Sequence, residues 1–324
     1  MGVKMGMCDP GPLLSCVIVS YNTREMTLDC LRTVVTDLGR MPAELWVVDN
    51  ASTDGSPRAI REAFPDIHLI ENQSNIGFGA ANNQAMQQAN GDFFLLLNSD
   101  AFPTSGAIAT MLNYLQEHPD VGLVGPRLLN KDGSLQRSCF RFPYPAAAWR
   151  ENLWISNLFS HRSPLGDYRR WNHDEERAVD YVIGACLLIR RSVFDQVGGF
   201  DERFFMYSEE ADWQKRIGDA GWKVVFLPTV EVTHLGGASG AAEKARINRH
   251  FFESLDYYEW KHYGLLGLVS FRLAMIVGGL LRLIAWVLVL IVIPRRRGTA
   301  RTKIRLLRWL TIRQATHWRV PFVA

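Results

Sequence analysis

The sequence contains only five cysteines, and their arrangement fits neither a metal motif nor a disulfide framework. They include no CxxC pair, are odd in number and have no ligand-like spacing to histidine. Cys16 and Cys186 lie inside apolar runs, where cysteine usually packs as a small core residue. The cysteine pattern therefore favours a reducing cytoplasm.

The N-terminal segment lacks a targeting signal. Residues 1–12 contain no apolar stretch of the kind that a secretory signal requires, and position 6 is Gly where a myristoylation motif has Ser or Thr. We treat residues 1–12 as an N-terminal extension and expect the folded body of the chain to stay in the cytoplasm.

The C-terminal segment lacks acidic residues. Residues 295–324 carry nine Lys and Arg and no Asp or Glu. Because these nine positive charges exceed the formal net charge of +3 of the whole chain, the rest of the chain is mildly acidic. Nucleic-acid binding would require basic residues spread over a folded face, whereas these follow an apolar run. The order favours a membrane surface as a partner and argues against nucleic acid.

The apolar run before this tail is long enough to cross a bilayer. Residues 273–293 contain a single charge, Arg282, and a bilayer core is roughly 30 Å thick. Residues 301–313 then alternate basic and apolar positions, as in a basic amphipathic helix. A single span would place the basic tail outside, against the usual charge bias, so we favour a re-entrant or in-plane helix. A buried C-terminal helical hairpin is the alternative.

The first part of the chain has the pattern of an α/β fold with a mainly parallel sheet. With 48% hydrophobic and 21% charged residues, the chain can bury a large core. From residue 13 to residue 126, short apolar runs alternate with amphipathic stretches, as in βαβ units. The predicted strands are 13–20, 44–49, 67–72, 92–98 and 121–125, and the predicted helices are 24–38, 56–64, 79–90 and 105–117.

The rest of the chain divides into a loop-rich insertion and closing elements. Residues 134–178 are rich in Arg, aromatics and Pro, which predicts irregular structure. After them we expect a buried strand at 181–189, helices at 191–197 and 209–220, and strands at 223–227 and 230–234. We therefore predict one domain over residues 13–260 and a membrane-associated segment over residues 261–324.

Polar residues follow several of the predicted strands. In open α/β sheets, ligands bind at the carboxyl ends of the strands, so these residues should gather on one edge. They are Ser20, Tyr21 and Asn22, Asp49 and Asn50, and Asn98, Ser99 and Asp100.

Asp49 is a candidate nucleotide-binding residue. A carboxylate at a strand end can accept a hydrogen bond from a pyrimidine N3–H or a ribose hydroxyl, although Asp49, Asn50 and Asp54 could equally cap a turn and a helix, as we expect for Asp54. The loop 75–82, which ends in Asn82, contains two glycines before a helix and suits close approach by a diphosphate.

Asn98 and Asp100 are candidates for a metal and diphosphate site. Strand side chains alternate, so both should face one ligand, and Mg²⁺ or Mn²⁺ binds one or two protein oxygens together with phosphate oxygens. Asp100 is the first choice as a metal ligand. His234 ends the last strand before a glycine-rich loop, which favours a metal or phosphate role as much as a structural one. The alternative is that Asn98 and Asp100 only start a turn.

Three acidic residues follow an aromatic run. Glu209, Glu210 and Asp212 come directly after Tyr207 and Ser208 and before Trp213. Ser208 could cap a helix whose first turn favours acids, which explains the acids but not the aromatics. A sugar hydroxyl needs a carboxylate to take its proton, and aromatic walls suit sugar faces, so one of the three is the expected base. Tyr207, Trp213 and the two remaining acids are acceptor-site candidates.

Six segments in this order resemble the inverting nucleotide-sugar glycosyltransferases of family 2, and among them the rhamnosyltransferase-like group of bacterial cell-surface polysaccharide assembly. The resemblance covers roughly residues 13–240. The segments are VIVSYN (17–22), VVDNASTDGS (47–56), NIGFGAANN (75–83), GDFFLLLNSD (91–100), GACLLIRRSVFDQVGGFDERFFMYSEEADW (184–213) and HLGGASG (234–240).

The resemblance implies a GT-A type domain and assigns roles to its residues. Asp49 falls at the position that binds the base or ribose, Asn98 and Asp100 at the Asp-x-Asp metal motif, and Glu210 at the general base. His234 falls where the metal or diphosphate site is completed. Two residues depart from the family pattern: Asn98 replaces a carboxylate, and Glu210 replaces the usual Asp.

The resemblance also implies the reaction and its partners. It implies inverting, metal-assisted transfer of a single sugar, with L-rhamnose from dTDP-rhamnose as the expected donor and a glycan or polyprenyl-linked glycan as the acceptor, at the cytoplasmic face of the inner (plasma) membrane. The processive Gln-x-x-Arg-Trp motif is absent from the matching region. The alternatives are a UDP-hexose donor or a sugar-binding scaffold with a decayed transferase domain. A nucleotidyltransferase would need a basic, Gly-rich phosphate loop, which residues 17–25 lack.

Overall fold

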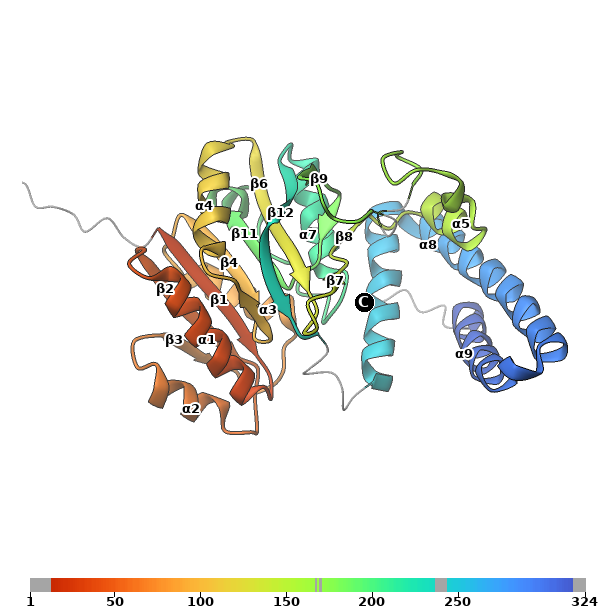
Figure 1. Cartoon of the computed structure of the whole chain (residues 1–324), viewed down its shortest axis with the longest axis horizontal. Coiled ribbons are helices and arrows are strands. Elements are labelled where there is room, and N and C mark those ends of the chain that lie inside the picture. Colours follow the sequence, from red (N-terminus) through yellow and green to blue (C-terminus); the bar gives the residue numbers. More distant parts are fainter. Residues whose placement is uncertain (1–12, 167, 169–170, 237–243, 317–324) are drawn as a thin grey trace, which may run out of the picture. The chain divides into compact units, whose positions relative to one another are not determined.

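The computed structural model describes residues 13–166, 168, 171–236 and 244–316 (Figure 1). The predicted N-terminal extension, residues 1–12, lies outside them. The chain forms two compact units. One comprises the described residues of Met1–Arg141 and Asn172–Phe251, and the other those of Phe142–Trp171 and Phe252–Ala324. The domain limits at residues 13–260 and 261–324 stay a prediction.

The first unit is built on a ten-stranded mixed sheet with the order β3-β2-β1-β4-β11-β6-β12-β5, to which β7 and β9 are added. All pairs among β3, β2, β1 and β4 are parallel, whereas β11 runs antiparallel to β4 and β6. A separate two-stranded sheet pairs β8 with β10. The strands are β1 Leu14–Ser20, β2 Ala43–Asp49, β3 His68–Glu71, β4 Phe93–Asn98, β5 Ala101–Pro103, β6 Val121–Leu129, β7 Leu135–Gln136, β8 Cys139–Phe140, β9 Arg177–Ala178, β10 Tyr181–Val182, β11 Cys186–Arg190 and β12 Lys223–His234.

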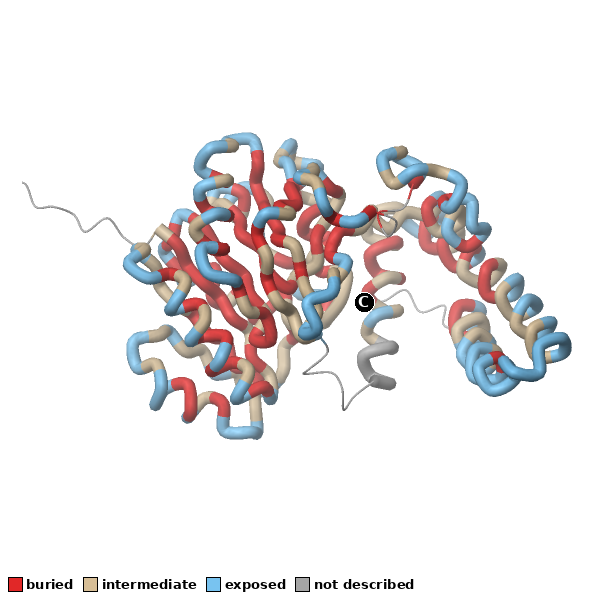
Figure 2. Tube along the Cα trace, in the orientation of Figure 1, coloured by how far each residue is buried: buried red, intermediate tan, exposed pale blue. Residues whose placement is uncertain are grey.

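Helices cover both faces of this sheet, and its central strands are buried over most of their length (Figures 1 and 2). Helices α1 and α4 pack on one face, and α3 packs against β1 and β2 on the other. The helices of this unit are α1 Arg24–Leu38, α2 Ser56–Ala63, α3 Phe78–Gln88, α4 Ala107–Glu117, α6 Arg191–Val197 and α7 Glu209–Asp219.

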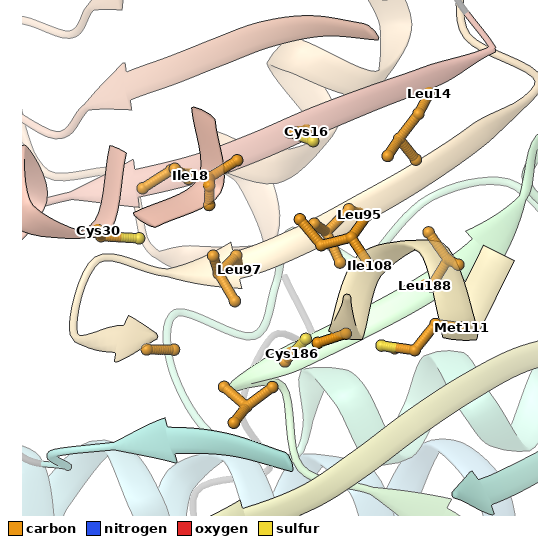
Figure 3. Packing of buried hydrophobic residues seen from close by; sticks show 14 of the residues in the cluster. Leu14, Cys16, Ile18, Cys30, Leu95, Leu97, Ile108, Met111, Cys186 and Leu188 are labelled. Carbon is orange, nitrogen blue, oxygen red and sulfur yellow. The ribbon is translucent and has the colours of Figure 1, made fainter. Parts of the chain in front are cut away.

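The core lies between the sheet and helices α1 and α4. Alternate residues of β1 and β4, whose side chains point to one face, meet apolar residues of the two helices there. Figure 3 shows this packing, with Cys16 and Cys186 among the buried side chains. Burial raises the pKa of the Cys186 thiol to about 12, which keeps it protonated. Both cysteines are therefore core residues, as the apolar runs around them predict.

Three of the predicted strands are divided or joined differently in the structure. The expected strand at 181–189 is divided into β10 and β11, which belong to different sheets. Gly184 lies at the break and has Phe78 against it, so the chain turns where no side chain would fit freely. The two expected strands at 223–227 and 230–234 form the continuous strand β12, whose register shifts between Leu227 and Glu231. Pro228 lies in that interval and cannot donate a ladder hydrogen bond.

The second unit is helical. It contains α5 Pro145–Asn152, the short 3₁₀ helices η1 Ile155–Leu158 and η4 Pro294–Arg296, most of α8 Lys244–Val292, and α9 Arg297–Thr316. Helix α8 is interrupted at Gly264, whose positive φ of 67° is not helical. Part of the expected loop-rich insertion, residues 142–171, belongs to this unit.

A buried ion cluster and an exposed apolar surface characterise the helical unit. The Asp256 carboxylate accepts a hydrogen bond from Arg272 at 2.9 Å and lies 3.5 Å from Arg313 of α9. Beyond the Gly264 interruption, α8 exposes large apolar side chains. His250–Val292 is the one helix among the described residues that is long and apolar enough to cross a membrane.

Candidate active site

Four strand ends meet at one edge of the sheet. They are far apart in the sequence, and the pairing of the strands brings them together. Ser20 pairs with Asp49, and Val19 pairs with Asn98, in the parallel ladders of β1 with β2 and β4. The register of β5 with β12 pairs Ala101 with His234. The predicted convergence of polar residues at the carboxyl ends of the strands is therefore present.

Asp49 has one carboxylate oxygen available for a ligand. Its Oδ1 accepts a hydrogen bond from the Ser52 backbone N–H at 2.8 Å, so part of its role is to hold the turn that follows β2. Its Oδ2 is buried and has no hydrogen-bond partner in the described structure. A buried carboxylate oxygen without a partner is costly, and a ligand N–H or hydroxyl would satisfy it.

Asn50 shapes the neighbouring loop. Its side chain accepts a hydrogen bond from Asn72 at 3.0 Å and donates one to the Gly77 carbonyl at 3.1 Å. Gly77 has a φ of 93°, and a Cβ there would lie 2.4 Å from the Phe205 carbonyl oxygen. Only glycine fits, because this loop passes close to the chain that leads into α7.

Three of the predicted donor-binding residues have structural partners. The Ser20 hydroxyl bonds Thr27 at 2.9 Å, and the Ser99 hydroxyl bonds Thr23 at 3.0 Å, which ties the start of α1 to the turn after β4. Asn82 is buried and donates to the Phe78 carbonyl one turn earlier in α3, at 2.9 Å. These side chains therefore hold the loops and helices around the site in place.

Asn22 links two loops and leaves Tyr21 half-buried beside it. The Asn22 Oδ1 accepts a hydrogen bond from the Thr53 backbone at 2.8 Å, and the Asn22 backbone N–H donates to Ser52.

Asp54, which we expected to cap a helix, accepts a hydrogen bond from the backbone N–H of Ser56, the first residue of α2, at 3.0 Å. Asp54 therefore holds the turn that leads into α2, whereas the N-cap position of that helix is Gly55.

Asp100 and Asn98 face the same imidazole. The Asp100 Oδ1 and the Asn98 Nδ2 each lie 3.3 Å from the His234 Nε2. Strand β4 ends at Asn98, so the turn after it and the pairing of β5 with β12 bring these groups together, whereas the prediction relied on side-chain alternation within one strand.

The residues present fit a divalent cation that also binds donor phosphates. Asp100 Oδ1 and His234 Nε2 are about as far apart as neighbouring ligands of an octahedral Mg²⁺ or Mn²⁺, which are roughly 3 Å apart. No group of three or more His, Cys, Asp or Glu side chains that could hold a metal occurs in the described parts of the chain.

Glu209 and Glu210 begin helix α7 and are both perturbed by burial. Burial raises the pKa of Glu210, and burial with the charge of Glu210 raises the pKa of Glu209 well above its usual range. Glu209 is almost fully buried, whereas Glu210 is half-buried, and each has a buried Oε2 without a hydrogen-bond partner in the described structure. Glu210 is thus the more accessible of the two carboxylates.

Glu210 lies beside the strand that borders Asn98. A Cβ placed on Gly184 would lie 3.8 Å from the Glu210 Cβ. The next residue, Ala185, accepts a hydrogen bond through its carbonyl from the Asn98 backbone N–H at 3.0 Å. Glu210 and the end of β4 therefore meet the same short segment, residues 184–185.

The backbone that leads into α7 is strained. Tyr207 and Ser208 have φ values of 70° and 64°, the left-handed region that non-glycine residues rarely adopt. Consecutive residues of this kind usually occur at functional sites. Ser208 occupies the N-cap position of α7, but its side chain makes no capping hydrogen bond to the helix.

Two acceptor-site candidates have structural roles. Asp212 is fully buried and pairs with Arg216 at 3.0 Å, and Arg216 also donates to the Val197 and Gly199 carbonyls. Trp213 is fully buried, and its indole N–H donates to the Gly198 carbonyl at 2.8 Å. Both side chains pack in the core of this structure, and their role as acceptor-site residues stays a prediction.

Sequence reasoning missed two residues that organise the site. Asn83 bonds both the N–H and the carbonyl of Phe200, each at 2.9 Å, and so fixes the loop between α6 and α7 to α3. Gln136 of β7 contacts His234 through its side chain, at 2.6 Å from Nδ1. Neither residue follows a predicted strand in the sequence. Asn83 is the last residue of the segment NIGFGAANN, and that was the one signal for it.

The sheet order, the carboxyl-end site and the Asp–His pair define a glycosyltransferase domain of the GT-A type. The chain belongs to glycosyl transferase family 2, because the sequence model of that family matches residues 15–198.

The chain is similar to several glycan-synthesis proteins. It is 33% identical over 212 residues to an N-acetylglucosaminyl-diphospho-decaprenol L-rhamnosyltransferase of Mycobacterium tuberculosis. The aligned region covers 60% of this chain and 66% of the relative, just under two thirds of the relative's length. It is 29% identical over 255 residues to the O-antigen biosynthesis protein RfbC of Myxococcus xanthus, covering 75% of this chain and 19% of that protein.

The fold also matches a solved structure. A mannosyltransferase from Pyrobaculum calidifontis in complex with GDP-Man and Mn²⁺ aligns with a TM-score of 0.58 and 20% identity, covering 95% of this chain and 88% of that one. At this identity the likeness establishes the fold alone.

Proposed function

We propose that the chain is an inverting glycosyltransferase that moves a single sugar from a nucleoside diphosphate to a hydroxyl of a glycan acceptor. The observation that carries the proposal is the position of Asp49, the Asp100–His234 pair and Glu210 around one sheet edge. They supply, in order, a nucleotide contact, a diphosphate-side cation site and a base.

Asp49 and Asp100 would hold the donor at opposite ends. The unpartnered Asp49 Oδ2 suits a pyrimidine N–H or a ribose hydroxyl. Asp100 and His234 would hold Mg²⁺ or Mn²⁺, which neutralises charge on the departing diphosphate. The Mn²⁺ present with the Pyrobaculum calidifontis mannosyltransferase supports this choice of cofactor.

Glu210 would take the proton of the attacking hydroxyl. Its raised pKa improves it as a base, because a base is most effective when its pKa lies near the working pH. Half-burial leaves it accessible, and Tyr207, also half-buried, would line the acceptor side. Burial and the charge of Glu210 raise the pKa of Glu209, which favours the neutral form of Glu209 beside the base.

The relatives and the helical unit support a choice of donor and acceptor. We propose dTDP-rhamnose as the donor and a polyprenyl-linked glycan as the acceptor, because the Mycobacterium tuberculosis relative is an N-acetylglucosaminyl-diphospho-decaprenol L-rhamnosyltransferase. The exposed apolar surface of α8 and the basic tail support docking on the cytoplasmic face of the inner membrane, where such a lipid would be reached.

The test is a transfer assay with purified full-length protein, membrane lipid extract, and a panel of dTDP-, UDP- and GDP-sugars. Transfer of rhamnose to a lipid product, with inverted anomeric configuration by NMR, supports the proposal. Preference for a UDP-hexose would contradict the donor. A protein that binds donor but neither hydrolyses nor transfers it would instead be a scaffold with a decayed transferase domain.

A further inference from the structure

Gln136 reaches His234 from a hairpin outside the family motifs. Strand β7 pairs antiparallel with the end of β6, and β6 runs beside β12, which ends at His234. The Gln136 Nε2 faces two carbonyl-type acceptors, the Asn130 Oδ1 at 3.1 Å and the His234 backbone oxygen at 3.3 Å. An amide nitrogen must donate to both, so the orientation of the Gln136 amide is fixed.

This orientation determines the tautomer of His234. The Gln136 Oε1 is 2.6 Å from the His234 Nδ1 and can only accept, so Nδ1 must carry a proton. On the other side of the ring, the His234 Nε2 lies 3.3 Å from the Asn98 Nδ2 and 3.3 Å from the Asp100 Oδ1. When the proton of the neutral imidazole is on Nδ1, the lone pair is on Nε2, the ring nitrogen beside Asp100.

We propose that Gln136 is a positioning residue that keeps the His234 Nε2 lone pair directed at the diphosphate-side cation. Two acceptor atoms that face each other repel unless a cation lies between them, so the tautomer prepares the pair for Mg²⁺ or Mn²⁺. The inference rests on the cation role in the proposed function. Gln136 itself touches neither donor nor acceptor in this scheme.

Two substitutions separate the acceptor role of Gln136 from its packing role. Gln136→Glu keeps an oxygen that accepts from Nδ1–H but removes the two donated hydrogen bonds. Gln136→Leu removes both functions at similar size. Ser134→Ala is the control for hydrogen bonding within the hairpin, because the Ser134 hydroxyl bonds Asp132 and Asn130 while the Gln136–His234 contact itself is left in place.

The readouts do not depend on turnover. Long-range ¹H–¹⁵N NMR on protein labelled with ¹⁵N-histidine reports the His234 tautomer, with His234→Gln providing the assignment. Titration with Mn²⁺ in the presence of dTDP, followed by EPR of free Mn²⁺, reports cation affinity. Thermal unfolding checks that each variant is folded.

We expect wild type, Gln136→Glu and Ser134→Ala to show the Nδ1–H tautomer and to bind Mn²⁺ within about threefold of each other. Gln136→Leu should lose the tautomer preference and bind Mn²⁺ about 10–100-fold more weakly, as other outer-shell changes do. An unchanged tautomer and affinity in folded Gln136→Leu, or an equal loss in Gln136→Glu, overturns the inference, and so does wild type that binds no Mn²⁺ with dTDP. Mn²⁺ binding without any sugar transfer would overturn the proposed function alone.

Discussion

The Oδ1 of Asp100 lies 3.3 Å from the Nε2 of His234, although Asp100 follows β4 and His234 ends β12. The pairing of β5 with β12 holds the two residues together, and the Asp100 carbonyl accepts a hydrogen bond from the Leu235 backbone N–H at 3.0 Å. The geometry of this pair is therefore built into the sheet, which makes its removal a clean test of metal assistance.

Asp100→Ala should lower transferase activity by roughly 100-fold or more, since a bound cation contributes several kcal/mol to stabilising the departing charge. Activity measured with Mg²⁺, with Mn²⁺ and in excess EDTA checks this. Asp66→Asn, an exposed acid in the loop before β3, is the control and should behave as wild type. Full turnover in EDTA would show that no cation is needed.

Asp49→Asn should weaken nucleotide binding. The unpartnered Oδ2 would lose its charge, and hydrogen bonds to charged groups contribute about 1.5–3 kcal/mol, which corresponds to roughly a 10–100-fold higher Kd for dTDP. Calorimetric titration of the folded variant with dTDP and Mg²⁺ measures it.

Asp54→Asn provides the contrast from the same loop. Its carboxylate holds the backbone of Arg24 at 2.9 Å and that of Ser56 at 3.0 Å, so the variant should lose stability while its dTDP affinity stays near wild type. Equal dTDP affinity for Asp49→Asn and wild type would remove the nucleotide role of Asp49.

The sheet and its edge could be predicted from the sequence because they depend on local pattern. Alternating apolar runs gave the strands of the parallel half within one or two residues, and helix α1 has the predicted limits of residues 24–38. The division at Gly184 was missed because a continuous apolar run does not reveal that its first two residues pair with β8 in another sheet.

The supporting contacts of the site could not be predicted, because they join residues far apart in the chain. Gln136 and His234 meet only through the packing of β7, β6 and β12. Likewise, Glu209, Glu210 and Asp212 look equivalent in the sequence, and only burial and the Arg216 ion pair separate the structural Asp212 from the accessible Glu210.

Glu209→Gln should make stability less sensitive to alkaline pH. Burial and the neighbouring Glu210 raise the pKa of Glu209 in the folded state, so its stabilising contribution is complete below the ordinary unfolded value and is lost as the pH rises toward the folded value. Between these two pKa values the folded chain binds one proton more than the unfolded chain. The free energy of unfolding then falls by up to about 1.4 kcal/mol per pH unit.

Denaturant unfolding between pH 5 and pH 9 tests this, with Glu117→Gln as the exposed control. Wild type and the control should lose stability with rising pH more steeply than Glu209→Gln. Parallel curves for all three proteins would show that Glu209 ionises normally.

Replacing exposed apolar residues of α8 should release the protein from membranes. Leu280, Ile284, Leu288 and Ile291 recur at helical spacing and are exposed, so their change to Gln removes apolar area that a bilayer would bury. The matched charge variant converts Arg295, Arg296 and Arg297 to Gln, each worth about 1 kcal/mol at an anionic surface.

Flotation with vesicles that contain or lack anionic lipid distinguishes the two contributions. The apolar variant should fail to float with either vesicle, whereas the charge variant should lose only the salt-sensitive binding to anionic vesicles. Wild type that remains soluble without lipid at low and high salt, and does not float, would rule out membrane docking.

Glu210→Gln should lower kcat by roughly 10²–10⁴, the usual contribution of a positioned base, with little change in donor affinity. Nucleotide binding should survive because Asp49 lies at the end of strand β2, whereas Glu210 lies at the start of helix α7. Glu210→Asp keeps a carboxylate one methylene shorter and should restore part of the rate. Because burial raises the pKa of Glu210, the acid limb of kcat/KM should lie above the ordinary range of a glutamate.

Glu209→Gln and Asp212→Asn identify the base by elimination. Asp212→Asn breaks the buried pair with Arg216, so it should lower the unfolding temperature more than it lowers kcat in the folded protein. Glu209→Gln keeps the accessible carboxylate and should leave the acid limb close to that of wild type, because burial is the main cause of the raised pKa of Glu210. If Glu210→Gln turned over normally while folded Glu209→Gln were inactive, the base would be Glu209, and the strained Tyr207–Ser208 backbone would have to move to expose it.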